Sequence, residues 1–192
     1  MTPRLPPPDS DLVERRELLD AGGLGRTLRR MALEIAERVP EDQRPLYLVG
    51  VRTGGAFLAQ RLSSFLAEAG EPKPLLGAVD ISLYRDDVFR GLPKPEIGPT
   101  ELPEPIDGRT VVLVDDVLFT GRTIRAAMDV LADYGRPRAV KLAALVDRGR
   151  RELPIQPDVV GVSLATTARE SVRVMLVERG EVDRVVLRER RA

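Results

Sequence analysis

The chain alternates between short runs of branched apolar residues and longer stretches in which apolar residues recur every three or four positions. Continuous apolar runs are typical of strands buried on both faces of a sheet, and the second spacing is typical of helices. We expect such strands at 46–51, 110–114 and 140–146, and helices at 24–39, 57–66 and 124–134. The alternation predicts a mostly parallel central sheet flanked by helices.

Weaker apolar segments complete this pattern. We expect further strands at 75–84 and 159–161, and a terminal hairpin of 172–177 and 185–187 that turns at 178–183. The proline-rich residues 1–11 are expected to form a disordered lead, and residues 12–192 a single domain.

Residues 88–105 interrupt the pattern with five prolines and little periodicity. A loop of this length inside a compact domain is usually a lid or a binding loop. Arg85, Arg90 and Lys94 would bring positive charge over a phosphate-bearing ligand when such a lid closes. An ordinary exposed hairpin is the alternative, and we favour the lid.

The strand at 110–114 is followed by the segment with the most candidate binding residues. Asp115 and Asp116 follow it, and then Thr120, Gly121 and Thr123 precede a helix. Ligands of parallel sheets bind at such strand ends, where free backbone N–H groups and the helix dipole favour phosphate. The carboxylates repel phosphate, so they suit sugar hydroxyls or a hydrated Mg²⁺. The stretch predicts a site for a phosphorylated sugar.

A second glycine turn follows the strand at 46–51 and consists of Arg52, Thr53, Gly54 and Gly55. Its backbone N–H groups would also suit an anion. One such turn is weak evidence, because tight turns need glycine for conformational reasons. Two of them in one small sheet support a common anionic ligand.

Composition excludes several classes of site. The chain has no cysteine and no histidine, so thiol chemistry, imidazole catalysis and histidine-bound metals are excluded. Its apolar runs are far shorter than the about 20 residues of a membrane span, and its first residues do not resemble a signal peptide. We therefore expect a cytoplasmic protein with no membrane contact, whose metal, if any, is a hard cation on oxygen ligands.

Charge is balanced, with 30 basic and 30 acidic residues, so nucleic-acid binding would need a local patch. Arg26, Arg29 and Arg30 share the polar side of the helix expected at 24–39. They form either a solvated charged face, which we favour, or a strip that binds an anion or RNA.

Residues 111–123 resemble the phosphoribosyl-pyrophosphate (PRPP) signature of type I phosphoribosyltransferases. Segments 49–53, 80–87, 121–128, 145–149 and 151–154 resemble the PyrR family. Its members bind leader RNA as attenuators of pyrimidine operons and act as uracil phosphoribosyltransferases. The resemblance implies the type I fold, with a hood region and terminal hairpin at 147–187 and a flexible loop at 88–105.

The resemblance also implies roles for individual residues. Asp115 and Asp116 would hold the ribose hydroxyls and, through water or PRPP, Mg²⁺. The 5-phosphate would lie on Val117, Leu118, Phe119, Thr120, Gly121, Arg122 and Thr123. Pyrophosphate would lie on Arg52, Thr53, Gly54 and Gly55, with Arg85 closing over it. Uracil would contact Asp147, Arg148 and Val172, and leader RNA would contact Arg29, Arg30, Arg150 and Arg151.

Phe119 bears on the choice of base. Purine-specific relatives typically carry an acid at this position to handle a purine ring nitrogen, and an apolar side chain cannot do so. The residue therefore favours a pyrimidine, with uracil as substrate and UMP or UTP as bound nucleotides.

Several positions depart from the family pattern. Gly54 replaces an arginine that many relatives carry in the pyrophosphate turn, which predicts weaker transferase activity. Leu33 and Arg150 stand where attenuators often have histidine, and Gln156 and Val162 stand where they have basic residues. Losing phosphate contacts weakens RNA binding.

Two functions are therefore predicted, a Mg²⁺-dependent uracil phosphoribosyltransferase and a nucleotide-responsive RNA-binding regulator. We expect both in one protein that forms a homodimer or a larger homo-oligomer. The alternative is a phosphoribosyltransferase or nucleotide-binding protein that has lost RNA attenuation. A receiver domain would explain the acidic pair but not the phosphate loop.

Overall fold

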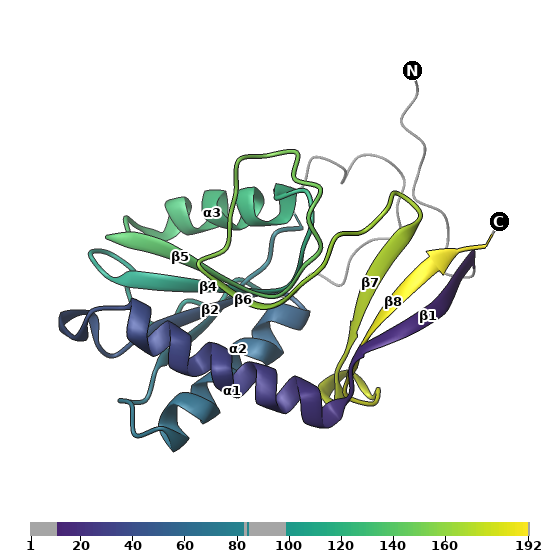
Figure 1. Ribbon diagram of the computed structural model, residues 1–192. Coiled ribbons are helices and arrows are strands. Elements are labelled where there is room, and N and C mark those ends of the chain that lie inside the picture. Colours follow the sequence, from purple (N-terminus) through teal and green to yellow (C-terminus); the bar gives the residue numbers. More distant parts are fainter. Residues whose placement is uncertain (1–10, 83, 85–98, 192) are drawn as a thin grey trace.

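A computed structural model describes residues 11–82, 84 and 99–191 (Figure 1). Its strands are β1 (Leu12–Leu19), β2 (Tyr47–Val51), β3 (Leu75–Val79), β4 (Thr110–Leu118), β5 (Ala139–Asp147), β6 (Val159–Ser163), β7 (Glu170–Met175) and β8 (Arg184–Arg190). Its helices are α1 (Ala21–Arg38), α2 (Gly54–Glu68) and α3 (Arg122–Tyr134), with short 3₁₀ turns η2 (Glu41–Gln43) and η3 (Val177–Arg179). Residues 1–10 of the expected lead at 1–11, Arg85 and most of the expected lid lie outside the described residues.

The central sheet is parallel and has the strand order β3-β2-β4-β5-β6. Helices α1 and α2 cover one face, and α3 covers the other (Figure 1). Strands β2 and β4 lie in the middle of the sheet and are almost wholly buried, as their continuous apolar runs predicted. The predicted mostly parallel sheet flanked by helices is confirmed.

Each helix begins at a recognisable start signal, either a capping side chain or a glycine turn. Asp20 caps α1 by accepting a hydrogen bond of 2.6 Å from the Gly23 N–H. Both other helices start at the glycine turns, α2 at Gly54 and α3 directly after Gly121, so each turn presents a helix N-terminus. Within the described residues, no helix is both long and apolar enough to cross a membrane.

A second, antiparallel sheet has the order β1-β8-β7 and stands beside the parallel one (Figure 1). We call it the hood sheet. Strands β7 and β8 form the predicted terminal hairpin; β7 begins and ends two residues earlier than expected, and β8 is longer than expected. Strand β1 was not predicted, because its four central residues are charged and exposed, which hides the alternation of a half-buried strand.

The prediction of a strand over 75–84 is wrong beyond Val79. Side chains, one of them distant in sequence, accept backbone N–H groups there. The Asp80 carboxylate accepts the Ser82 N–H at 2.6 Å, and the Thr100 hydroxyl accepts the Asp80 N–H at 3.1 Å. The chain therefore turns at the carboxyl edge of the sheet instead of continuing the strand.

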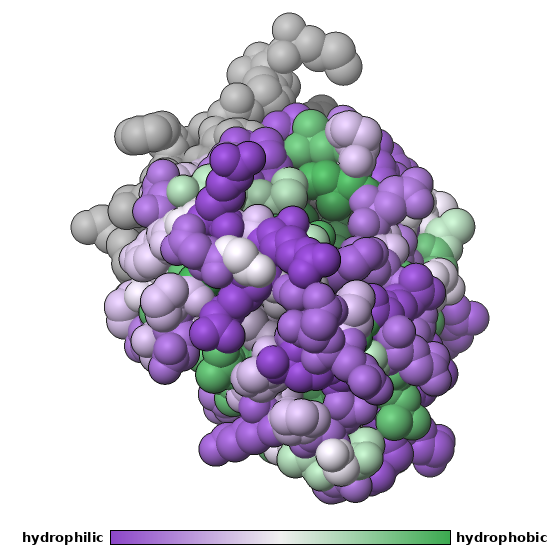
Figure 2. Space-filling view, turned by 90° about the vertical axis from the view of Figure 1, so that its left-hand side faces the viewer, coloured by the Kyte–Doolittle hydropathy of each residue, from purple (hydrophilic) through white to green (hydrophobic). Residues whose placement is uncertain are grey.

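The surface is strongly polar, in keeping with the many charged residues of the chain. Figure 2 shows a face that is mainly hydrophilic, on which hydrophobic groups form small separate patches. Many surface arginines pair with carboxylates, such as Arg15 with Glu189 at 2.8 Å and Arg138 with Asp42 at 3.3 Å. Exposed pairs of this kind contribute little to stability, so the two hydrophobic layers around the parallel sheet hold the fold together.

Candidate functional site

The acidic pair lies at the carboxyl end of β4, at the middle of the parallel sheet. Each carboxylate accepts a hydrogen bond from the next backbone N–H, Asp115 from Asp116 at 3.0 Å and Asp116 from Val117 at 2.8 Å. Burial raises the pKa of Asp115 well above its ordinary value, and the neighbouring charge of Asp116 raises it further. Burial also raises the pKa of Asp116, although the Val117 N–H and then Arg179 partly offset this.

These raised pKa values predict that ionisation of Asp115 and Asp116 destabilises the folded protein. When the pKa of a carboxyl group is higher in the folded than in the unfolded protein, the free energy of unfolding falls as pH rises from the unfolded pKa, about 4, to the folded pKa. The protein stays destabilised by this amount at all higher pH values. We therefore expect Asp115→Asn to raise the free energy of unfolding at pH 8. The gain should shrink toward pH 4, where the wild-type carboxyl is protonated in both states.

Urea unfolding of both proteins at pH 4, 6 and 8 measures this difference. The matched control is Asp42→Asn, which removes an exposed carboxylate on η2, away from the pair. An Asp115→Asn protein that is less stable than wild type at pH 8 would contradict the prediction.

The phosphate loop connects β4 to α3 and includes Thr120 and Gly121. Gly121 has a positive φ of 94° and no side chain to cap the helix that follows it, and the Arg122 N–H donates to the Thr120 hydroxyl at 3.4 Å. The first N–H groups of a helix have no partner within it, so this N-terminus offers donors to an anion. The backbone carbonyl of Thr120 accepts the N–H groups of Glu152 and Leu153 at 3.0 and 3.1 Å, which ties the loop to the segment after β5.

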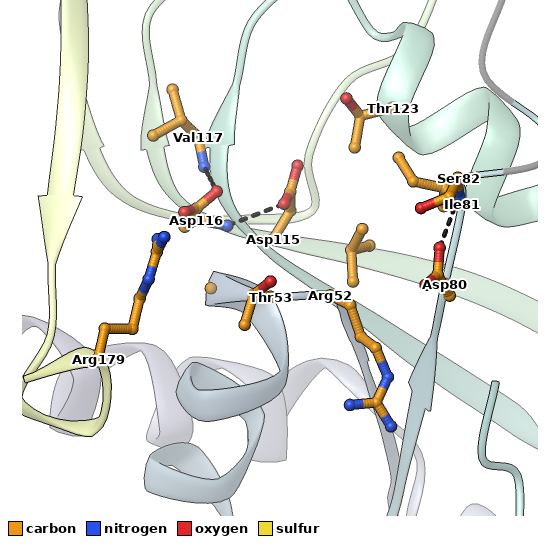
Figure 3. A pocket seen from close by; sticks show the side chains of 12 residues that line it. Arg52, Thr53, Asp80, Ile81, Ser82, Asp115, Asp116, Val117, Thr123 and Arg179 are labelled. Carbon is orange, nitrogen blue, oxygen red and sulfur yellow. Dashed lines mark hydrogen bonds between the residues drawn. The ribbon is translucent and has the colours of Figure 1, made fainter. Parts of the chain in front are cut away.

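The pyrophosphate turn lies beside the acidic pair. A Cβ atom on Gly54 would come within 2.3 Å of an oxygen of Asp116, so glycine lets the turn and the carboxylate approach each other. Arg52 donates to the backbone carbonyl of Pro99 at 2.9 Å and pairs with Glu101 at 3.2 Å. Its guanidinium points away from the acidic pair in Figure 3.

One pocket of about 330 Å³ joins these elements (Figure 3). Of the residues predicted for the site, it is lined by Arg52, Thr53, Gly54, Asp115, Asp116, Val117 and Thr123. It is also lined by five residues without a predicted role in the site, Asp80, Ile81, Ser82, Val51 and Arg179. The first three follow β3, and only the strand order brings them to β4.

The segment expected to contact the base lies next to the phosphate loop. The guanidinium of Arg148 stacks over the Phe119 ring, 4.0 Å from its centroid. Arg148 is buried and donates to the Thr166 hydroxyl at 3.0 Å and to the Glu170 carbonyl at 2.6 Å. Burial lowers its pKa, and nearby Arg150 lowers it further.

The other two residues expected at the base have structural partners. Asp147 accepts hydrogen bonds from the Gly149 N–H at 2.9 Å and from Arg151 at 2.7 Å. Val172 is half-buried on β7 and packs against the hydrophobic layer under α1 and α2. Neither residue lines the pocket of Figure 3.

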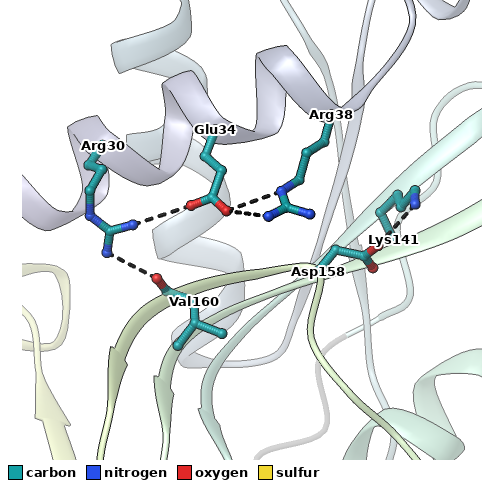
Figure 4. A network of polar contacts seen from close by, with 6 residues as sticks. All are labelled: Arg30, Glu34, Arg38, Lys141, Asp158 and Val160. Atoms are coloured by element: carbon teal, nitrogen blue, oxygen red, sulfur yellow. Dashed lines mark hydrogen bonds and ion pairs between the residues drawn. The ribbon is translucent and has the colours of Figure 1, made fainter.

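The four candidate RNA contacts come from two segments, α1 and the residues after β5. Arg30 on α1 pairs with Glu34 and donates to the carbonyls of Val160 and Gly161 at 3.0 and 2.6 Å (Figure 4). Arg29 pairs with Glu68 at 2.8 Å, and its guanidinium lies 4.9 Å from the centroid of the Phe65 ring.

The other two candidates follow β5. Arg151 donates to the carbonyls of Phe119 and Ile155 at 2.9 and 2.8 Å in addition to its bond with Asp147, so it braces the phosphate loop. Arg150 is exposed, has a positive φ of 58°, and makes no ion pair or hydrogen bond with the described part of the chain.

The donor set suits a hard cation that also binds the substrate. No group of three or more acidic residues that could hold a metal occurs among the described residues. Asp115 and Asp116 offer carboxylate oxygens in one polar pocket, with the Ser82 segment opposite. Mg²⁺ is typically bound by one or two carboxylates together with substrate phosphates and water, so the pair fits such an ion.

Comparison with known proteins places this geometry in a family. The model of the phosphoribosyl transferase domain matches residues 14–178. The bifunctional protein PyrR of Syntrophobacter fumaroxidans is 51% identical over 172 residues, which cover 90% of this chain and 92% of the relative. The PyrR protein of Streptomyces coelicolor is 51% identical over 175 residues, covering 91% and 90%.

Solved structures agree with the fold. The hypoxanthine phosphoribosyltransferase of Trypanosoma cruzi has a TM-score of 0.67 at 17% identity, covering 93% of this chain and 98% of its own. An enzyme of Leishmania tarentolae solved with GMP has a TM-score of 0.62 at 17% identity, covering 91% and 96%. The parallel sheet, its flanking helices and the hood sheet are those of the type I phosphoribosyltransferase fold.

Proposed function

The chain belongs to the PyrR family of phosphoribosyltransferases, and we propose that it is bifunctional in the sense of that family. It transfers the phosphoribosyl group of PRPP to uracil, which yields UMP and pyrophosphate, and it regulates pyrimidine operons by binding leader RNA in response to uridine nucleotides. The observation that carries the enzymatic part is one pocket that joins the acidic pair, the start of α3 and the pyrophosphate turn.

The reaction needs positioning and electrostatic stabilisation. A ring nitrogen of uracil displaces pyrophosphate from the anomeric carbon, so positive charge builds on the sugar and negative charge on the leaving group. Asp115 and Asp116 accept hydrogen bonds from the ribose hydroxyls and stabilise the developing positive charge. The N-terminus of α3 and Thr123 hold the 5-phosphate, which fixes the sugar relative to both other groups.

Mg²⁺ supplies charge neutralisation of the pyrophosphate oxygens when it is bound, and Asp115 and Asp116 would hold it directly or through water. We expect activity to fall by at least 100-fold in EDTA and to return with Mg²⁺, because electrostatic stabilisation of the leaving group is lost. Rates measured in a Mg²⁺ titration after EDTA treatment check this. Full activity in EDTA would contradict the metal requirement.

Uracil selectivity is proposed to come from the Phe119 side of the site. Phe119 offers no acid for a purine nitrogen, and the buried guanidinium of Arg148, held by Thr166 and Glu170, fixes the position of the Phe119 ring. The test is UMP formation from uracil and PRPP by the purified protein with Mg²⁺, with hypoxanthine and guanine as competing bases. Absence of turnover at any uracil concentration would refute the enzymatic part.

The regulatory part uses the same pocket to sense UMP or UTP and a separate surface to bind RNA. The candidates with exposed side chains are Arg29, Arg30 and Arg150. The side chain of Arg151 is mostly buried against the phosphate loop. We further propose that the protein works in the cytoplasm as a homodimer or larger homo-oligomer.

A gel-shift experiment with a pyrimidine-operon leader RNA, with and without UMP, tests the regulatory part. A shift that UMP enhances and that salt weakens is expected, because phosphate contacts dominate such binding. Its absence would favour the alternative, a phosphoribosyltransferase that has lost attenuation.

A further inference from the structure

Arg179 is the one pocket-lining residue that comes from the hood sheet rather than from the parallel sheet and its turns. It is the last residue of η3, the 3₁₀ turn between β7 and β8. Its side chain extends from that turn toward Asp116 (Figure 3). Thr123 and Arg179 lie on opposite sides of the acidic pair in this view, so Arg179 approaches the pair from the side that does not carry Thr123.

The turn that carries Arg179 is clamped to α2. Arg61 of α2 donates to both carboxylate oxygens of Glu178, at 2.7 and 2.5 Å, and to both of Asp183, at 2.6 and 2.8 Å. Asp183 also accepts the Val177 N–H at 2.9 Å. These bonds lower the pKa of Glu178 and Asp183. Because α2 begins in the pyrophosphate turn, the clamp fixes η3 relative to that turn.

The guanidinium of Arg179 forms no ion pair or hydrogen bond with any residue that the structure describes. Its charge acts on Asp116 only from a distance, by partly offsetting the rise that burial causes in the pKa of that carboxyl. Arg52, the other arginine that lines the pocket within residues 11–82, 84 and 99–191, is engaged with Pro99 and Glu101. The guanidinium of Arg179 therefore retains its donors for a ligand, beside a carboxylate that Gly54 approaches closely.

We propose that Arg179 is a substrate-binding residue that contacts the diphosphate of PRPP and the pyrophosphate product, and that Arg61, Glu178 and Asp183 position it. The proposal rests on the proposed transferase function. An arginine fork suits phosphate oxygens, and the position lies on the pyrophosphate side of the acidic pair. It supplies a positive charge near Asp116, the carboxylate that Gly54 of the pyrophosphate turn approaches closely.

The test is the binding of inorganic pyrophosphate with Mg²⁺, and separately of UMP, to the full chain and to Arg179→Gln, by calorimetry. We expect pyrophosphate affinity to fall about 10- to 100-fold, as for loss of a hydrogen bond to a charged group. UMP affinity should stay within about twofold, because the nucleotide lacks the diphosphate. In Arg179→Gln, KM for PRPP should rise in parallel with the dissociation constant of pyrophosphate. Arg179→Lys keeps the positive charge and should retain part of the pyrophosphate affinity.

Two further variants separate contact from fold. Arg184→Gln removes a guanidinium from the same hairpin, where it pairs with exposed Glu14 at 2.9 Å, and should leave both affinities unchanged. Arg61→Gln should reproduce the selective loss of pyrophosphate affinity, since it releases the turn. Adding Arg179→Gln to Arg61→Gln should then cost little more, because both changes remove the same contact.

An unchanged pyrophosphate affinity in Arg179→Gln would overturn the proposal, as would an equal loss for UMP, which would assign the residue to the nucleotide phosphate. These measurements need no turnover. If the wild-type protein binds pyrophosphate with Mg²⁺ but forms no UMP, the transferase function fails while the contact of Arg179 with pyrophosphate stands. If it binds neither pyrophosphate nor PRPP, both proposals fail.

Discussion

Replacing Asp116 by asparagine is expected to lower kcat/KM for PRPP by about 100- to 1,000-fold, the cost typical of losing one preorganised electrostatic contact at a transition state. Asparagine keeps the size of the side chain and an oxygen that can accept the Val117 N–H, so the loop should keep its shape. What is lost is the negative charge beside the cationic sugar. Initial rates of UMP formation at varied PRPP measure the effect.

Asp42→Asn serves as the control for this experiment, because it removes a surface carboxylate on η2 and should leave the rate unchanged. Circular dichroism of the Asp116→Asn protein checks that the fold is intact. A variant that folds and retains more than about a tenth of the wild-type kcat/KM would contradict the role proposed for Asp116.

Replacing Gly55 by alanine is expected to destabilise the protein and to remove most of its activity. A Cβ atom at this position would meet the carbonyl oxygen of Val114 at 2.2 Å and the backbone of Asp115 at 3.2 Å. Backbone cannot rotate away as a side chain can, so the start of α2 must move away from β4. Overpacking of this kind typically costs about 1–3 kcal/mol of unfolding free energy.

The same movement separates the pyrophosphate turn from the acidic pair, and a misplacement of about 1 Å can cost about 100-fold in rate. Urea unfolding and UMP formation measure the two effects. Gly25→Ala is the matched control, because Gly25 lies in α1 with nothing within 4 Å of the added Cβ and alanine favours helix there. A Gly55→Ala protein as stable and as active as Gly25→Ala would show that the close approach of α2 to β4 is not required.

The parallel sheet and both glycine turns could be predicted from sequence because each depends on local patterns. The apolar runs of β2 and β4 need no partner to be recognised, and the acidic pair directly follows one of them. The turn at Asp80 could not be predicted, because apolar and polar residues continue to alternate while Thr100, far along the chain, takes the backbone bond that would continue the strand.

Contacts between distant segments also explain the two largest omissions. Strand β1 has charged central residues and becomes a strand only by pairing with β8, at the other end of the chain. The orientation of Arg179 depends on Arg61, which precedes its partners Glu178 and Asp183 by 117 and 122 positions. In the sequence alone, nothing distinguishes Arg179 from the other arginines of this arginine-rich chain.

The central claim is that the carboxyl edge of the sheet binds a phosphorylated ribose, and a crystal structure of the protein with UMP tests it most directly. The account predicts the nucleotide phosphate on the backbone N–H groups of residues 120–123 and the ribose hydroxyls on Asp115 and Asp116. UMP bound elsewhere, or bound here with its ribose turned away from both carboxylates, would contradict the account.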